Sequence, residues 1–352
     1  MAQVQVNNAT VMQHEMLFLT DKNASLILSL VVKGTFDLLP KSEEGIECEL
    51  KFAEQQRPVN LDGEYVAQPE SSSYLYEPET AYTKPTTDIV VIGDAVSGRG
   101  PVRALTVDIK VGQLQKKLMV FGDRQWIKQS SSYRISTPEP FESLPLIYEN
   151  AFGGWDRRDS DESNHHFEAR NSVGKGFYHP EVTKKNIDSE LPLYLPNIEN
   201  PEQLIQKITD TPEPAGCGFT LPHWQPRVTL AGTYDEQWLT TKSPLLPDDF
   251  RSDFFNAASP GLIAPKYLCG DEKVQISNMT RNGLLIFELP KLNPYCSIEL
   301  TDSDNPMPLL LDTVIINLKN QQVELIWRNY LTVLGTHSVQ SVDISYTNKF
   351  DI

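Results

Sequence analysis

The sequence predicts a mainly β protein, with two β-rich portions (β-sandwich-like) joined by a long loop-rich middle segment with short helices. Three observations lead to this prediction. Strand-like apolar runs occur near both ends of the 352-residue chain, turn-forming residues follow them, and periodicity is weak between about residues 133 and 265. The length exceeds that of a usual single core, so we expect an N-terminal portion (1–132), a middle segment (133–265) and a C-terminal portion (266–352), or one composite domain.

The N-terminal portion contains three strand signals. Residues 25–36, "SLILSLVVKGTF", form an apolar run that ends at turn-forming residues, and residues 87–96, "TDIVVIGDAV", have the composition of a buried strand. Residues 104–121 predict a hairpin, because Val107, Ile109 and Val111 share one face and Gly112 begins a turn.

The middle segment offers two helix signals. Residues 200–208, "NPEQLIQKI", place Asn200 as a cap before a proline, which is a good helix start. Residues 246–258, "LPDDFRSDFFNAA", place two aspartates where the helix dipole favours anions, with Phe250 and Phe254 on one face. The rest predicts long loops, which in compact proteins are usually functional.

The C-terminal portion returns to strands. Residues 283–290, "GLLIFELP", precede a hairpin over residues 312–335, in which Val314 and Ile316 alternate before a turn at 319–322. Residues 338–346, "SVQSVDISY", complete the portion as an edge or closing strand.

Composition limits the partners. The formal net charge is -16 and no block of Lys or Arg occurs, so we expect no nucleic acid. The four cysteines lie far apart without a CxxC pair, which disfavours a zinc site. We find no secretory signal and no apolar run of the roughly 20 residues that span a bilayer. These features predict a cytoplasmic protein without membrane insertion and without a cofactor.

The charged stretch 148–180 raises the question of catalysis. Its carboxylates, such as Asp156 and Glu168, could serve as the acid and base of a glycosidase. Nothing apolar sits beside them to raise a pKa, and charges alternate as in a solvated loop. Cys217 stands between glycines without a recognisable base, and phosphate-loop and zinc-protease motifs are absent. We therefore predict that the chain is not an enzyme, with no catalytic or metal-binding residue.

Aromatic and arginine residues gather in the middle segment. Trp, Tyr and Arg commonly anchor protein interfaces, and they can equally pin an irregular region together. From the residue types alone both alternatives stay open. The residues are Trp155, Arg170, Trp224, Arg227, Tyr234 and Trp238.

Several motifs occur in a specific order: "YENAFGGWD", "RNSVGKGF", "LPNIENP", "PEPAGCGFTLPHWQPRVTLAGTYDEQWL", "PLLPDDFRSDFFNAA" and "LCGDEKVQISNMTRNGLLIFELP". This order closely resembles domain-of-unknown-function family 2169 of Gram-negative bacteria, over most of the chain. The resemblance implies an adaptor-chaperone of a type VI secretion system. Such a protein holds an effector, often PAAR- or Rhs-containing, and helps load it onto the VgrG spike. The chain has Asn-Ser-Val-Gly at 171–174, where the family usually has Asn-Pro-Val-Gly.

Composition and resemblance together assign residues to two groups. The first group is predicted to bind the effector: Trp155, Arg227, Tyr234 and Trp238. The second is predicted to form the structural motif: Gly153, Gly154, Asp156, Arg170, Asn171, Gly174, Gly176, Trp224, Asp235 and Asn256. Arg170 is expected to pair with Asp156 or Asp235. The alternatives are a carbohydrate-active β-sandwich enzyme and a structural component of a phage-tail-like spike.

Overall fold

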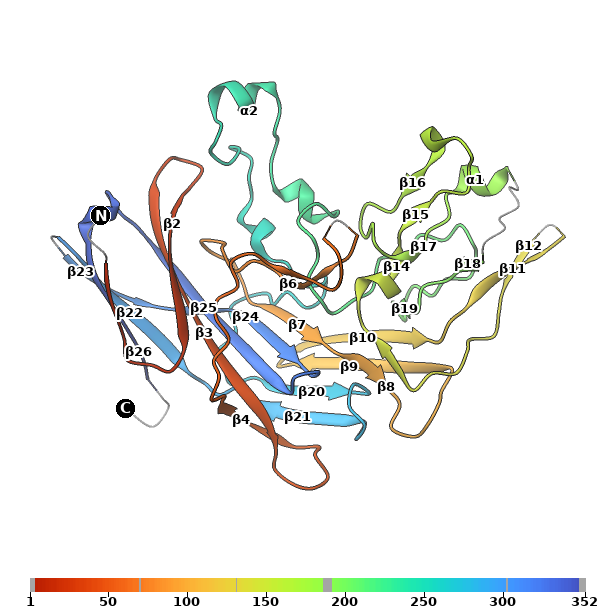
Figure 1. The fold of residues 1–352 in the computed structure, drawn as a ribbon, viewed down its shortest axis with the longest axis horizontal. Helices are drawn as coiled ribbons and strands as arrows, with labels where there is room; N and C mark the ends of the chain where they lie inside the picture. Colours follow the sequence, from red (N-terminus) through yellow and green to blue (C-terminus); the bar gives the residue numbers. More distant parts are fainter. Residues whose placement is uncertain (1–3, 70, 131, 186–191, 302, 348–352) are drawn as a thin grey trace.

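The computed structural model describes residues 4–69, 71–130, 132–185, 192–301 and 303–347, and it confirms a mainly β protein (Figure 1). Most strands belong to sheets of three to six strands. The α-helices of the described residues are short: α1 (Pro180–Lys184) and α2 (Glu236–Thr241). None of the helices in the described ranges combines the length and apolar character needed to cross a membrane.

The six-stranded sheet joins both ends of the chain. Its order is β2–β3–β25–β24–β7, and β4 pairs with β3 beside this path. The strands are β2 (Gln13–Thr20), β3 (Leu26–Pro40), β4 (Cys48–Phe52), β7 (Asp88–Ile92), β24 (Leu310–Asn317) and β25 (Gln322–Thr332). The central strands are covered on both faces, which explains why their sequences are nearly continuous apolar runs. Strands β7 and β24 run parallel.

The five-stranded sheet contains the predicted hairpin. Its order is β19–β10–β9–β20–β21. The strands are β9 (Ala104–Val111), β10 (Leu114–Phe121), β19 (Ile198–Glu199), β20 (Lys273–Ser277) and β21 (Leu284–Glu288). Val107, Ile109 and Val111 are buried on one face, as the alternation predicted. Residues of the N-terminal, middle and C-terminal ranges therefore share this sheet.

The third sheet has four strands, in the order β1–β26–β22–β23. They are β1 (Gln5–Asn8), β22 (Asn293–Leu300), β23 (Ser303–Pro308) and β26 (Val339–Thr347). The last strand was expected at an edge or as a closing strand. It lies inside the sheet, because β1 pairs with it in parallel on one side and β22 on the other. Pro306 and Pro308 stand in the edge strand β23, where a missing N–H is tolerated.

Smaller strand groups complete the fold. They are β5 (Glu64–Tyr65) with β6 (Tyr74–Tyr76), β8 (Asp94–Val96) with β13 (Ser143–Pro145), β11 (Gln125–Gln129) with β12 (Ser132–Ile135) and β18 (Leu193–Tyr194), β14 (Phe152–Gly153) with β17 (Lys175–Gly176), and β15 (Trp155–Asp156) with β16 (His166–Phe167). Single 3-10 turns lie at η1 (Tyr148–Asn150), η2 (Glu162–Asn164), η3 (Arg227–Leu230), η4 (Ser252–Phe255) and η5 (Thr336–Ser338).

One apolar core connects the three sheets. It runs from Leu28 in β3 through Ile109 in β9 to Ile344 in β26. A smaller cluster around Trp126 and Phe152 supports β11, β14 and β17. Both ends of the chain thus contribute to one interior, and the middle segment adds residues such as Tyr148, Phe219 and Trp224 to it.

A layer of charge lies beneath residues 53–87, which we call the strap. The strap crosses the six-stranded sheet and is tied to it by buried ion pairs. Lys33 in β3 contacts Glu79 of the strap at 2.7 Å and Glu324 in β25 at 2.9 Å. Lys84 pairs with Glu77 at 2.6 Å and with Asp88 at 2.8 Å. Each of these charged residues is under a tenth exposed, so the strap covers charge that the sequence gave no reason to place inside.

Both predicted helices of the middle segment are wrong. Residues 200–208 begin with the expected Asn200 turn, but carboxylates then bind the N–H groups that a helix would use. Glu199 accepts from Ile205, and Asp210 accepts from Gln206 and Lys207. Within 246–258 only the 3-10 turn η4 forms. Helix α2 lies upstream, where Asp235 caps it by accepting the Trp238 N–H.

Candidate functional site

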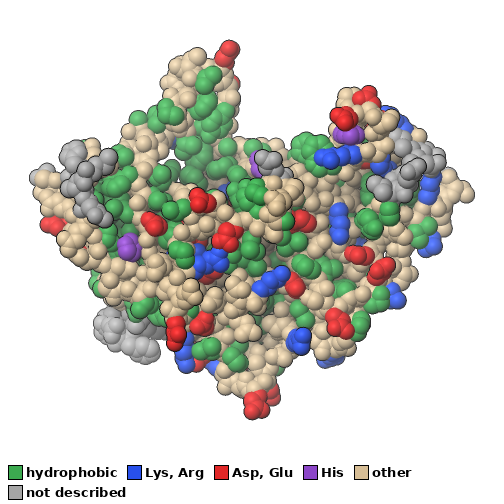
Figure 2. Space-filling view, viewed as in Figure 1, with side chains coloured by type: hydrophobic (Ala, Val, Ile, Leu, Met, Phe, Trp, Pro, Cys, Tyr) green, Lys and Arg blue, Asp and Glu red, His purple; other side chains and the backbone are tan. Residues whose placement is uncertain are grey.

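Residues 231–251 form a projection, which we call the arm. The arm leaves the body after η3 and returns at η4, and a hydrogen bond from Arg251 N–H to the Leu230 carbonyl closes its base at 3.0 Å. Helix α2 stands at its far end, pointing away from the sheets (Figure 1). In the same view, the segment that carries α1 and β16 also projects, and the surface is hollowed between them (Figure 2).

The arm holds its own shape through local hydrogen bonds. Asp249 accepts from the backbone and side chain of Thr233, at 2.9 and 2.8 Å. The Trp238 indole donates to the Leu245 carbonyl at 2.9 Å and meets the Tyr234 ring edge to face. The projection is thus pre-organised, so a partner would not have to order it on binding.

Apolar side chains of the arm are exposed. Leu239 is 62% exposed and Tyr234 is 52% exposed, while Trp238 and Leu245 are half-buried. Figure 2 shows hydrophobic side chains gathered along the projection. No residue of the arm belongs to either apolar cluster of the described residues. A folding chain gains little from such a surface, which is typical of a binding site.

A pocket of about 390 Å³ lies at the base of the arm, and we call it the arm pocket. Its walls come from η3, η4, the strap end and the segment after β16. They include Thr86, Tyr148, Arg170, Glu213, Pro214, Pro226, Arg227, Leu230, Asp253, Asn256, Pro260 and Ile263. The pocket therefore brings together Arg170, Arg227 and Asn256, three residues that the sequence had singled out.

Arg227 and Asn256 hold the arm pocket together from behind. The Arg227 guanidinium donates to the carbonyls of Phe254 and Thr220, so it ties η3 to η4. It also reaches Glu77 of the strap at 3.3 Å. The Asn256 amide donates to the Thr86 carbonyl at 3.0 Å and to Asp88 at 2.9 Å. These bonds hold both side chains in place, so we expect Arg227 to act as a scaffold pin of the pocket rather than as an exposed anchor.

Arg170 has a different partner from the one expected. The sequence indicated Asp156 or Asp235, but Arg170 forms a two-pronged pair with Glu168, with both distances at 2.7 Å. Asp156 instead binds Arg158, and Asp235 caps α2. The reason is local: a carboxylate two residues away satisfies the arginine at little entropic cost.

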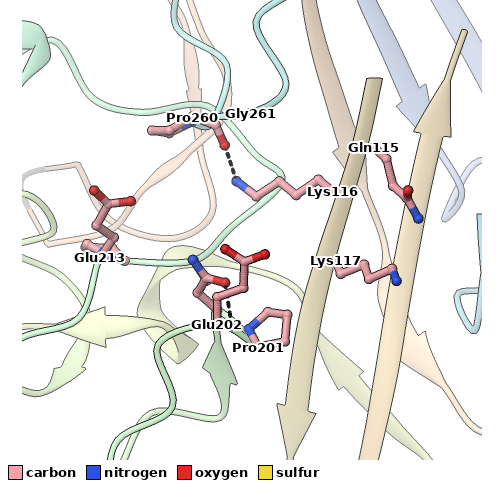
Figure 3. A pocket seen from close by; sticks show the side chains of 11 residues that line it. Gln115, Lys116, Lys117, Pro201, Glu202, Glu213, Pro260 and Gly261 are labelled. Carbon is pink, nitrogen blue, oxygen red and sulfur yellow. Dashed lines mark hydrogen bonds between the residues drawn. The ribbon is translucent and has the colours of Figure 1, made fainter. Parts of the chain in front are cut away.

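A second pocket of about 440 Å³ shares Glu213, Pro214 and Pro260 with the first (Figure 3). Lys116 reaches from β10 towards Pro260 and donates to the Ser259 hydroxyl and the Pro260 carbonyl, both at 2.6 Å. No carboxylate of the described residues makes an ion pair with it. Burial lowers the pKa of Lys116 to about 8, and Glu213 and Cys217 act weakly in the opposite direction. The sequence gave no signal for this lysine.

Trp155 lies in β15, which pairs with β16 on the segment that projects beside the arm; we call this segment the second projection. The Trp155 side chain is 46% exposed and stacks on Phe167, its cross-strand neighbour, with ring centroids 4.7 Å apart. The Arg157 guanidinium lies over the indole at 4.8 Å. The two rings form an exposed aromatic platform, and the sequence did not single out Phe167.

The glycine motif packs backbone against backbone. Gly153 and Gly154 have φ of 153° and 87°, and a Cβ on either would collide with the carbonyl oxygen of Asn171 or Gly174. Asn171 is fully buried and donates to the carbonyls of Tyr148 and Phe152, at 2.8 and 3.0 Å.

The remaining motif residues also make internal contacts. The ring of Trp224 is buried, and its N–H reaches the Ser172 hydroxyl at 3.3 Å. Gly176, at a φ of 92°, approaches Pro196 closely. Both contacts are internal to the fold.

The carboxylates considered for catalysis are tied to arginines. Asp156 accepts two hydrogen bonds from the Arg158 side chain, both at 2.8 Å, one from the Arg158 backbone N–H at 3.3 Å and one from the His179 N–H at 2.7 Å. Burial acts to raise the pKa of Asp156, but these donors outweigh it and the pKa is lowered. A glycosidase acid needs a raised pKa, so the arrangement does not favour that alternative. The Cys217 thiol is buried, and burial raises its pKa to about 12, away from a reactive thiolate.

Comparison with known proteins places the chain in a family. Residues 23–328 match the family described as "Uncharacterized protein conserved in bacteria (DUF2169)". The match covers most of the chain, and the protein belongs to this family. Comparisons with curated proteins and with solved structures gave no match.

Proposed function

We propose that this protein is a cytoplasmic adaptor-chaperone that binds a type VI secretion effector and helps load it onto the VgrG/PAAR spike. The arm is the observation that carries this proposal. It is pre-organised, exposes Tyr234 and Leu239, and contributes nothing to the apolar clusters of the described residues. A rigid surface of this kind fits a protein partner better than it fits a small substrate. The order of the sequence motifs supplies the secretion context.

Co-expression tests the proposal. The chain is produced with the effector encoded beside it, and co-purification and effector solubility are measured. We expect a stable complex and a rise in the apparent stability of the effector when the adaptor is in excess. The double variant Tyr234→Ala/Leu239→Ala should lose most of the complex and still fold, because both side chains are exposed.

The matched control is Tyr295→Ala, which removes a ring of similar exposure (42%) from β22 and should leave the complex intact. An effector that neither co-purifies nor gains solubility would contradict the proposal. Stable trimers of the isolated chain would favour the alternative of a structural spike component.

A further inference from the structure

Acidic residues outnumber basic residues on the arm, around its apolar side chains. Its acidic residues, all exposed, are Asp235, Glu236, Asp248 and Asp249. Its two cations are already paired, Lys242 with Asp248 and Arg251 with Asp253. The remaining acids form no ion pair within the arm, which is described in full. From outside the arm, Lys22 donates to the Asp248 carbonyl at 3.1 Å. Hydrogen bonds from Thr233 lower the pKa of Asp249, so this group stays ionised.

The arm pocket carries charges of both signs. It is lined by four charged side chains: Arg170, Arg227, Glu213 and Asp253. Three of them form ion pairs. Arg170 pairs with Glu168, Arg227 with Glu77 and Asp253 with Arg251. Glu213 is exposed and makes no ion pair with any described residue. Glu213 is therefore the one of these four charges without an ion pair, although Arg170 and Lys116 lie within electrostatic reach of it. It lies beside walls formed by Pro226, Leu230 and Ile263.

These charges discriminate between occupants. A second copy of this chain has a formal net charge of -16 and would bring like charges to the arm. An anionic lipid surface would be repelled for the same reason. A protein segment that carries Lys or Arg beside large aliphatic side chains would satisfy the free carboxylates and cover Tyr234 and Leu239.

We propose that the arm and the arm pocket bind a basic, apolar segment of the partner protein. The aliphatic side chains of this segment cover the end of the arm and enter the pocket, and its cations pair with Glu236, Asp249 and Glu213. This inference rests on the proposed function, because it assigns the chemistry of the effector segment that the arm would take. The affinity for this segment should then fall as salt rises, and it should also fall when the exposed side chains Tyr234 and Leu239 are removed.

Three labelled peptides of equal length serve as probes for the full chain. One alternates Leu and Lys at helical spacing, one replaces Lys by Glu, and one replaces Leu by Ser. Binding is followed by fluorescence anisotropy at low and high salt. We expect the Leu-Lys peptide to bind at least about tenfold more tightly than the other two, and to weaken as salt rises.

Variants locate the binding. Tyr234→Ala and Leu239→Ala should each weaken the Leu-Lys peptide by roughly tenfold or more. Glu236→Gln should weaken it by a smaller factor and reduce the salt dependence. The controls Tyr295→Ala and Glu54→Gln change an exposed ring and an exposed acid elsewhere, and should leave affinity unchanged.

Two results would overturn the inference: equal binding of the Leu-Glu peptide, or Leu-Lys binding that Tyr234→Ala and Leu239→Ala do not alter. Failure of the proposed function looks different. If the peptides behave as expected but the neighbouring effector does not co-purify, the arm has this specificity and the adaptor role is wrong. If the effector binds but the peptides do not discriminate, only the partner chemistry is wrong.

Discussion

The layer beneath the strap and the surface of the arm are opposites. Under the strap, Lys33, Glu79 and Glu324 are nearly inaccessible and lie within 2.9 Å of a partner. On the arm, Tyr234 and Leu239 are more than half exposed and pack into no apolar cluster of the described residues. One region buries charge and the other exposes apolar surface, so each reverses the usual arrangement of a soluble protein.

The buried charges under the strap are explained by contacts within the fold, whereas the exposed apolar side chains of the arm are not. Each of the buried lysines Lys33 and Lys84 is held by two carboxylates, so removal of the lysine would leave two buried carboxylates without it. Burial raises the pKa of Glu79 even with Lys33 beside it, which shows how strongly the site is desolvated. The arm has no comparable internal reason to expose Leu239, so its surface indicates binding.

The largest expected effect is on the strap. Lys33→Met removes the cation that Glu79 and Glu324 share and leaves only the Arg57 guanidinium, 3.9 Å from Glu324, so the free energy of unfolding should fall by about 3–5 kcal/mol. Urea denaturation measures it. Lys51→Met, which breaks an exposed pair with Glu49, should cost less than about 1 kcal/mol. Equal losses in the two variants would show that the buried layer holds the strap no better than a surface pair.

Arg227→Ala should come next. It removes hydrogen bonds to the Phe254 and Thr220 carbonyls at the base of the arm, and stability should fall by about 2 kcal/mol. Affinity for the effector should fall only in proportion to the folded protein that is lost. Arg251→Ala, whose side chain is 64% exposed, is the control. If Arg227→Ala folds normally and binds weakly, Arg227 is an anchor and the assignment as a pin is wrong.

A smaller effect is expected at Trp155. Its ring lies outside the core on the second projection, so Trp155→Ala should leave the melting temperature nearly unchanged. If this projection also touches the effector, affinity should fall by about 1 kcal/mol, or roughly fivefold. Titration calorimetry with the effector measures it, and Phe167→Ala should reproduce it because the two rings stack. Unchanged affinity in both variants would confine the interface to the arm.

The smallest effect concerns pH. The pKa of Lys116 in the folded chain is about 8, below its usual value. Above about pH 8, the unfolded chain therefore binds more protons at this lysine than the folded chain does. The free energy of unfolding should therefore rise by about 1 kcal/mol between pH 9 and pH 10, relative to Lys116→Met. Denaturation of both proteins across this range tests it. A slope that is the same in both would show that Lys116 keeps its ordinary pKa.

Local patterns predicted the strands well and the helices poorly. The hairpin at 104–121 follows from strict alternation and a glycine turn, and both are local features of the chain. The helix predicted at 200–208 does not form, because the flanking carboxylates of Glu199 and Asp210 accept hydrogen bonds from its backbone N–H groups. Helix α2 escaped prediction because Asp235 caps a run of only six residues.

The candidate site divides in the same way. Residue types pointed to Tyr234 and Trp238, since large rings in an irregular segment need a reason. Sequence reasoning could not separate Arg227 from Tyr234, because exposure depends on how η3 and η4 pack. It missed Leu239, because only the fold shows that this side chain is exposed. It also missed Lys116, because its partner Ser259 lies 143 residues away in the sequence.

The sequence by itself determined that the chain forms strands at both ends and an irregular middle, because alternation, turn residues and prolines act over a few residues. It also determined the family, through the order of its motifs. The tertiary structure alone decided that β3 pairs with β25 and β7 with β24, and that the strap covers paired charges. It alone separated the arm from the core, since burial depends on contacts between residues far apart in the chain.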